Sequence, residues 1–118
     1  AWVTAGESSQ VAVYDVRNAR VLRVLPADEG PQHVSFTAGR VFVTSGDAGT
    51  LRLYDAATLR HLGTTELPVG SYNVQFAGRR VLSPSLNAGT LCVVDSRGVV
   101  KQRLHVAASS HDACLAHA

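Results

Sequence analysis

The sequence aligns with itself when it is shifted by about forty positions, and this internal repeat restricts the possible folds more than any other feature. One shift relates the first and second thirds of the chain, and a second shift extends the match into the last third. The matching pairs include Val3-Thr4 with Val43-Thr44, Tyr14-Asp15 with Tyr54-Asp55, Gly30 with Gly70, Phe36 with Phe76, and Ala48-Gly49-Thr50-Leu51 with Ala88-Gly89-Thr90-Leu91. Because one spacing holds at so many positions, the chain is predicted to contain about three successive copies of one structural unit.

Each unit contains four short strand signals separated by turn residues. In the second unit, the runs 33–37, 40–44, 50–54 and 60–67 are rich in β-branched, aromatic or alternating apolar residues, and turn residues such as glycine, proline and aspartate follow them. No stretch keeps apolar residues at helical spacing over three turns. The predicted fold class is therefore all-β, built from four-stranded antiparallel sheets of about forty residues each.

Four-stranded units with this period are typical of the blades of a β-propeller. A single blade cannot bury both of its faces, so it needs a neighbour on each side in a radial arrangement. Three units are fewer than the four to eight blades that usually close a ring. The chain is therefore predicted to be a partial propeller or half of an oligomeric one.

Several segments make the match to a known family more specific. They are Phe42-Val43-Thr44-Ser45, Gly49 to Thr58, and Leu67-Pro68-Val69-Gly70, with Trp2-Val3-Thr4, Val11 to Asp15 and Gly30 to Val34 in the preceding copy. This pattern resembles the YVTN-type, WD40-like β-propeller repeat over nearly the whole chain. The third copy departs from it, because Ser83-Pro84 replaces the Val-Thr pair and Ser109-Ser110-His111-Asp112 replaces the Gly-Pro turn.

The resemblance implies that the innermost strand of each blade follows the Gly-Pro turn. On this basis residues 1–31 hold three strands of a first blade, 32–71 a second blade, 72–111 a third, and 112–118 the innermost strand of a next blade. The total is twelve strands in a single propeller segment, 1–118. The expected partners are the remaining blades of a longer chain or a second copy of the chain, which would close six blades as a homodimer.

Composition removes several other classes of protein. The net charge is +2, and ten arginines and one lysine are scattered rather than gathered into a basic patch, so no specific nucleic-acid binding is expected. No apolar run approaches the roughly 20 residues of a membrane span. The chain opens on a strand-like segment instead of a signal peptide, so we expect it to begin partway through a longer protein; the alternative is that a leader has been removed.

The loops that enter the innermost strands are the predicted binding site. In a propeller such loops converge at one mouth of the central channel. They carry polar residues that differ from copy to copy, as ligand contacts do: His33, Tyr72, Asn73, His111 and Asp112. Loops between the second and third strands add Glu7, Asp47 and Asn87 at one equivalent position. A small polar ligand or a protein is the expected partner; the alternative is that these residues are ordinary solvated loop tips.

Other repeated residues are predicted to be structural. Asp15, Asp55 and Asp95 each follow a strand, where a short carboxylate accepts backbone N–H groups of the turn it begins. Val34, Phe36, Val74 and Phe76 alternate on inner strands and are predicted to be core. Cys92 and Cys114 are predicted to be buried free thiols, with a disulfide between them as the alternative.

No motif for catalysis, for a metal site or for a cofactor stands out. There is no Gly-x-Ser-x-Gly elbow and no phosphate-binding glycine loop. Cys92 and Cys114 do not have the close pairing of a zinc site. His111, Asp112 and His117 resemble a set of metal ligands, but the lone inner strand would direct only one of the histidines, so no metal site is predicted. The resemblance favours a non-catalytic binding or scaffold protein that is secreted or periplasmic. The preference for Arg over Lys and the high content of Ala and Val indicate a bacterial source. The alternatives are a propeller enzyme, such as a lactonase-like hydrolase or a dehydrogenase subunit, and a structural surface protein.

Overall fold

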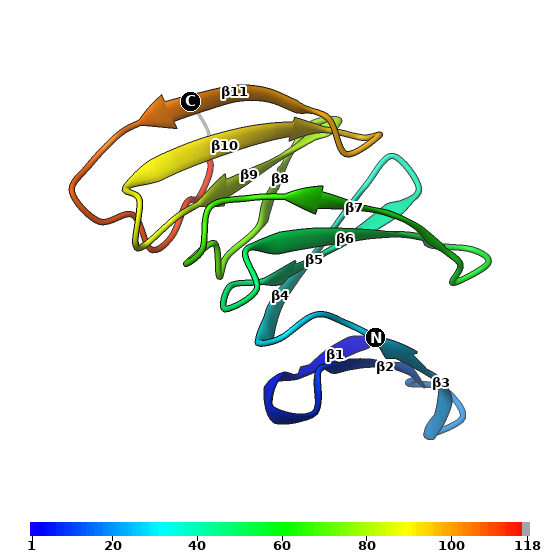
Figure 1. The fold of residues 1–118 in the computed structure, drawn as a ribbon. Helices are drawn as coiled ribbons and strands as arrows, with labels where there is room; N and C mark the ends of the chain where they lie inside the picture. Colours follow the sequence, from blue (N-terminus) through cyan, green and yellow to red (C-terminus); the bar gives the residue numbers. More distant parts are fainter. Residues whose placement is uncertain (117–118) are drawn as a thin grey trace.

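A computed structural model describes residues 1–116 of the chain, so His117 lies outside the described residues. Within this range the protein consists of eleven strands in three antiparallel sheets, with one short 3-10 turn, η1 (Gly6–Ser8) (Figure 1). The strands are β1 (Trp2–Ala5), β2 (Gln10–Asp15), β3 (Arg20–Pro26), β4 (Pro31–Thr37), β5 (Arg40–Ser45), β6 (Thr50–Asp55), β7 (His61–Glu66), β8 (Gln75–Ala77), β9 (Arg80–Pro84), β10 (Thr90–Asp95) and β11 (Val100–His105). The predicted all-β fold class is confirmed.

Each sheet is a simple meander in chain order. Sheet 1 contains β1 to β3, sheet 2 contains β4 to β7, and sheet 3 contains β8 to β11. The pairing register repeats with the sequence: Val3 lies opposite Ala12, Val43 opposite Arg52, and Ser83 opposite Cys92. Since side chains alternate between the two faces of a strand, this shared register sends equivalent residues to equivalent faces.

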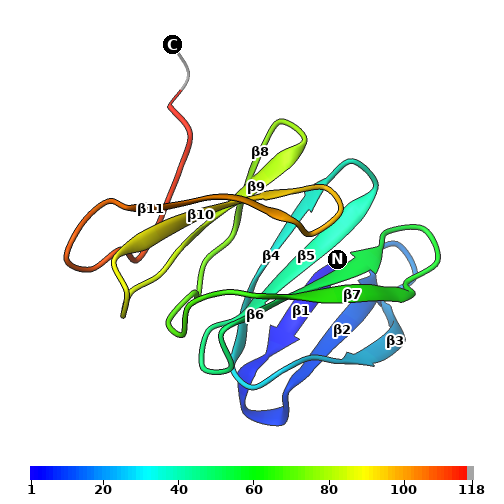
Figure 2. The same ribbon diagram turned by 45° about the horizontal axis from the view of Figure 1, so that its top comes forward.

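The three sheets pack face to face in succession, as both views of the ribbon show (Figures 1 and 2). One apolar cluster joins sheets 1 and 2 and includes Val11, Val13, Val41 and Tyr54. A second cluster joins sheets 2 and 3 through residues such as Phe42, Leu51, Val81 and Val94. On β5, Val41 faces sheet 1 and its neighbour Phe42 faces sheet 3, and both side chains are fully buried. The middle sheet therefore has neighbours on both faces, as a blade requires.

The repeated Val-Thr pair has a structural role in this stacking. The Thr4 hydroxyl donates to the Gln32 carbonyl at 3.1 Å, and the equivalent Thr44 hydroxyl donates to the Tyr72 carbonyl at 2.7 Å. Each bond ties the second strand of one blade to the segment that enters the innermost strand of the next. Pro84 occupies the same position in the third copy and has no hydroxyl to donate.

The repeated aspartates begin turns, as predicted. Oδ1 of Asp15, Asp55 and Asp95 each accepts two backbone N–H groups of the following turn, at 2.8 to 3.2 Å. Hydrogen bonds lower the pKa of all three carboxyls, chiefly from the Asn18 side chain for Asp15 and from backbone N–H groups for the other two. These carboxylates therefore accept the hydrogen bonds that hold their own turns.

Two sequence predictions need correction, and a third stays a prediction. The structure assigns no strand to residues 112–116, because no other strand of the described chain is hydrogen-bonded beside them; their place in a further blade stays a prediction. Both cysteines are free and Cys92 is buried, but Cys114 is exposed on this unpaired segment. The prediction that Phe36 and Phe76 are core is wrong, since each is half exposed.

Candidate functional site

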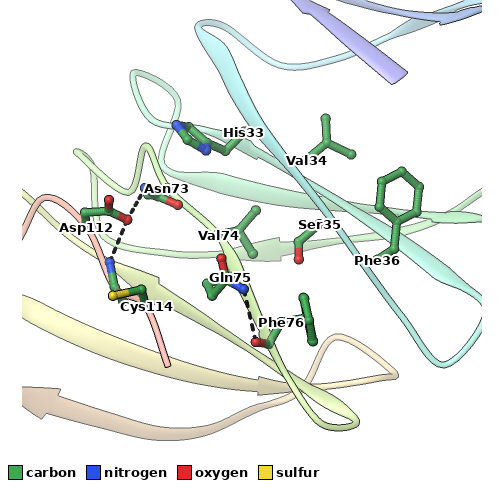
Figure 3. Close-up of a pocket in the computed structure, with 11 residues that line it drawn as sticks. His33, Val34, Ser35, Phe36, Asn73, Val74, Gln75, Phe76, Asp112 and Cys114 are labelled. Atoms are coloured by element: carbon green, nitrogen blue, oxygen red, sulfur yellow. Dashed lines mark hydrogen bonds between the residues drawn. The ribbon is translucent and has the colours of Figure 1, made fainter. Parts of the chain in front are cut away.

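A cavity of about 450 Å³ lies where the innermost segments of successive blades meet (Figure 3). Its walls come from residues 33–36 of β4, residues 73–76 at the start of β8, and residues 112–114. These three segments are separated by about forty positions, so the cavity is lined by the same part of the repeat three times. We call it the inner groove.

One end of the inner groove is polar. His33, Asn73 and Asp112 lie together there, away from the two phenylalanines (Figure 3). The Asn73 side-chain amide donates to the Asp112 carboxylate, which also accepts the backbone N–H of Ala113 at 2.7 Å. The backbone carbonyl of Asn73 accepts the Ser83 hydroxyl at 2.8 Å, and this bond to β9 fixes the segment that carries the amide. The Asp112 carboxylate and the Asn73 amide are thus held in a fixed orientation, and the exposed imidazole of His33 lies beside them.

The other end of the inner groove is aromatic. Phe36 and Phe76 both line the cavity and are half exposed, and the Phe36 ring makes an edge-to-face contact with Trp2 at a centroid distance of 6.4 Å. Alternation correctly places Phe36 on the same side of β4 as Val34. Both residues line the cavity, but Val34 also packs against the cluster between sheets 1 and 2, whereas Phe36 stays half exposed beside Trp2. The sequence pattern identifies the face but not the extent to which the adjacent sheet covers it.

Two of the five predicted site residues lie elsewhere. The Tyr72 hydroxyl donates to Asp47 Oδ1 at 2.8 Å, and this bond raises the pKa of the phenol. The Tyr72 ring lies directly over Gly46, where an added Cβ would be only 1.9 Å from a ring atom. His111 is exposed and does not line the inner groove. The structure therefore brings His33, Asn73 and Asp112 together and leaves Tyr72 and His111 outside.

The polar residues of the second-to-third-strand loops contribute to loop packing. Gly30 and Gly70 have positive φ values of 70° and 90°, and an added Cβ would lie 2.4 Å from Asp47 Oδ2 and 2.1 Å from Asn87 Oδ1, respectively. Glycine is therefore required at both turns. Glu7 lines a separate hollow of about 690 Å³ at the loops between sheets 1 and 2.

The sequence reasoning did not assign eight of the lining residues to the site: Val34, Ser35, Phe36, Val74, Gln75, Phe76, Ala113 and Cys114. They share one signal in the sequence, since they lie at the repeat positions predicted for innermost strands, which surround the axis of a propeller. Among residues 1–116, no three His, Cys, Asp or Glu side chains are grouped so that they could hold a metal ion. No helix in that range has the length and apolarity needed to cross a membrane.

Comparisons with known proteins identify the fold. No protein-family model and no curated protein matches the sequence. Among solved structures, the chain is similar to hydrazine synthase of Kuenenia stuttgartiensis (TM-score 0.84, 10% identity, 92% of this chain and 33% of that one). It is also similar to dihydro-heme d1 dehydrogenase NirN in complex with DHE (TM-score 0.77, 21% identity, 87% of this chain and 23% of that one). The computationally designed Ika4 protein also matches (TM-score 0.76, 18% identity, 92% and 68%).

These likenesses establish a β-propeller fold, with three sheets as its blades. The chain spans a quarter to a third of the length of the first two structures. At identities of 10 to 21%, the comparison extends to the fold and no further.

Proposed function

We propose that the protein is a non-catalytic β-propeller that binds a ligand or scaffolds a partner protein at the loop face around its central channel. The observation that carries this proposal is the inner groove, which joins a polar end and an aromatic end across three successive copies of the repeat. Ligand sites are typically concave, largely apolar and equipped with a few polar groups that fix orientation.

The groups in the groove favour a ligand of mixed chemistry. Asp112 offers a carboxylate, Asn73 an amide that can both donate and accept, and His33 an imidazole with one donor and one acceptor in its neutral form. Phe36 and Phe76 offer aromatic surface, which attracts apolar groups and cations. The groove therefore suits a small molecule or peptide end that has an ammonium or hydroxyl head and an apolar body.

The finer family assignment is part of the same proposal. The hydroxyl bonds of Thr4 and Thr44 to the next blade support a YVTN-type repeat, because they give the Val-Thr pair a physical role. A bacterial origin and a secreted or periplasmic location go with that assignment. The further partners proposed are the remaining blades of a longer chain or a second copy of this one.

Binding can be tested with phenethylamine, a probe with one ammonium group and one phenyl ring. In a two-dimensional amide NMR titration, we expect saturable shifts concentrated at residues 33–36, 73–76 and 112–114. His33→Ala should weaken binding about fivefold, the equivalent of roughly 1 kcal/mol for one lost polar contact. The matched control is His105→Ala, because His105 is exposed at the end of β11 and does not line the groove.

Either of two results would refute the proposed ligand class. The first is the absence of saturable shifts up to about 10 mM probe. Even a small fragment that binds with a millimolar Kd would begin to saturate the site at that concentration. The second is an equal loss of affinity in His33→Ala and His105→Ala. The stability of each variant is measured in parallel, because a loss above about 2 kcal/mol would identify His33 as structural.

A further inference from the structure

A further hollow, of about 300 Å³, lies between sheets 2 and 3. It is lined by Arg40 of β5, Leu53 of β6, residues 62–65 of β7, and Arg97 and Gly98 in the turn between β10 and β11. We call it the arginine hollow. It shares no lining residue with the inner groove, and all of its lining residues lie between positions 40 and 98. It is therefore a separate site inside the joint between two four-stranded sheets.

Two glycines keep the arginine hollow open. In the strand pairing, Gly63 takes the place that Arg23 has in sheet 1 and Gln102 has in sheet 3. A Cβ added at Gly63 would meet no atom of the described chain within 4 Å. In the turn of sheet 2, Leu59 has a φ of 63° and packs against the cluster between sheets 1 and 2, whereas the turn of sheet 3 has Gly98, with a φ of 86°, before its last strand. The hollow is therefore particular to the joint between sheets 2 and 3.

The two arginines of the hollow are only loosely paired. Arg40 Nη1 lies 3.5 Å from Asp55 Oδ2, and Arg97 Nη2 lies 3.7 Å from Asp95 Oδ2, so both distances are longer than those of an ordinary hydrogen bond. Each guanidinium has five N–H donors. Oδ1 of each aspartate is already bonded to the backbone of its own turn. Among the described residues, most of these guanidinium donors have no partner, and they remain available to a ligand.

The rest of the lining limits the ligand to a small one with an apolar part. Buried Leu53 and partly exposed Leu62 give the hollow an apolar wall. A volume of about 300 Å³ is at the lower end of the range of ligand sites. Because Asp55 and Asp95 balance the formal charge of the two arginines, one negative charge fits the hollow better than two. A carboxylate has that charge, and its two oxygens match the planar fork of a guanidinium.

We propose that the arginine hollow binds a small organic acid, whose carboxylate pairs with Arg40 and Arg97 while its compact apolar body lies against Leu53 and Leu62. This site prefers an anion, whereas the inner groove, with the Asp112 carboxylate, prefers a cation. The proposal goes beyond the function proposed for the inner groove and does not depend on it.

Phenylacetate, with one carboxylate and one phenyl ring, is a suitable probe. In a two-dimensional amide NMR titration, we expect saturable shifts at residues 62–65 and 97–98 and none at residues 33–36 and 73–76 of the inner groove. The neutral analogue 2-phenylethanol should bind at least about tenfold more weakly, because it lacks the charge that strengthens hydrogen bonds from arginine. Phenyl phosphate, which carries up to about two negative charges, should bind no more tightly than phenylacetate.

Two variants test the assigned residues. Arg97→Gln should weaken phenylacetate binding about tenfold. Its matched control is Arg17→Gln, because the Arg17 N–H bonds Asp15 Oδ1 as the Arg97 N–H bonds Asp95 Oδ1, and Arg17 does not line the hollow. Gly63→Leu should abolish binding and leave the melting temperature unchanged, since the new side chain enters open space.

Four results would overturn the proposal. They are the absence of saturable shifts at residues 62–65 and 97–98 up to about 10 mM phenylacetate, tighter binding of phenyl phosphate, equal losses in the two arginine variants, and unchanged affinity in folded Gly63→Leu. If Gly63→Leu fails to fold, the comparison of Arg97→Gln with Arg17→Gln decides.

Discussion

The connection between sheets 1 and 2 contains a partly buried ion pair, and the loss of stability on removing its charge can be estimated. Asp28 lies between β3 and β4, and its Oδ1 accepts a hydrogen bond from Arg52 Nη2 at 2.8 Å. Its Oδ2 accepts the Thr50 hydroxyl at 2.6 Å. Arg52 also donates to the Pro26 carbonyl at 3.2 Å. The side chains of Arg52 and Asp28 are 19% and 23% exposed, so the pair is mostly shielded from water.

Asp28→Asn keeps the size of the side chain and removes its charge. A hydrogen bond to a charged group contributes about 1.5–3 kcal/mol to stability, and partial exposure reduces that figure. We expect a loss of about 1–2 kcal/mol in the free energy of unfolding near pH 7, because Arg52 would lose its counter-charge. Urea denaturation measures the difference. Glu29→Gln is the matched control, since Glu29 is an exposed carboxylate next in sequence and should change stability by less than about 0.5 kcal/mol.

The pH dependence tests the electrostatic origin of this loss. The hydrogen bond from Arg52 is the largest cause that lowers the pKa of Asp28 below its ordinary value. The stability contributed by the ionised group is therefore fully present above the unfolded-state pKa of about 3.9. It is lost as the pH falls from there through the lower pKa of the folded state. The difference between the wild-type protein and Asp28→Asn should persist from pH 7 to about pH 5 and shrink below about pH 4. A difference that is absent at pH 7, or unchanged at about pH 2.5, would refute this reasoning.

Two further predictions concern packing. Phe42→Ala should lower the free energy of unfolding by about 3–5 kcal/mol, because Phe42 is fully buried between sheets 2 and 3. Phe76→Ala at the inner groove should lower it by less than about 1.5 kcal/mol, and equal losses in denaturant titrations would contradict the assigned burial. Gly46→Ala should displace the Tyr72 ring and break its hydrogen bond to Asp47, which lowers the free energy of unfolding by about 1–3 kcal/mol. The near-ultraviolet circular dichroism spectrum should change as well; an unaltered tyrosine signal would show that the loop moves and the ring does not.

The fold could be predicted from the sequence because the strand and turn pattern of one blade, and with it the packing between blades, recurs at one spacing. The alternation of Leu51 and Leu53, followed by Asp55, defines a strand and its turn, and the structure ends β6 at Asp55. The same pattern shifted by the repeat predicts β10, which ends at Asp95. A sheet that repeats identically along the chain must repeat its packing as well, so the stacking of blades followed from the strand pattern.

The site was less accessible to sequence reasoning because it depends on packing at the ends of the strands. Tyr72 and Asn73 are adjacent, yet Asn73 turns to Asp112 in the inner groove while Tyr72 turns to Asp47 over Gly46. Nothing in the local pattern distinguishes the two directions. The aromatic end was assigned to the core because alternation indicates a face, whereas the exposure of Phe76 depends on where the adjacent sheet stops.

The two joints between blades within the chain differ in their chemistry. The joint between sheets 1 and 2 uses Arg52, Asp28 and the hydroxyl of Tyr54, which donates to the Pro26 carbonyl at 2.5 Å. At the joint between sheets 2 and 3 the equivalents of Asp28, Arg52 and Tyr54 are Pro68, Cys92 and Val94, so the contact is apolar. Thr90, the equivalent of Thr50, consequently has a buried hydroxyl without a partner in the described chain.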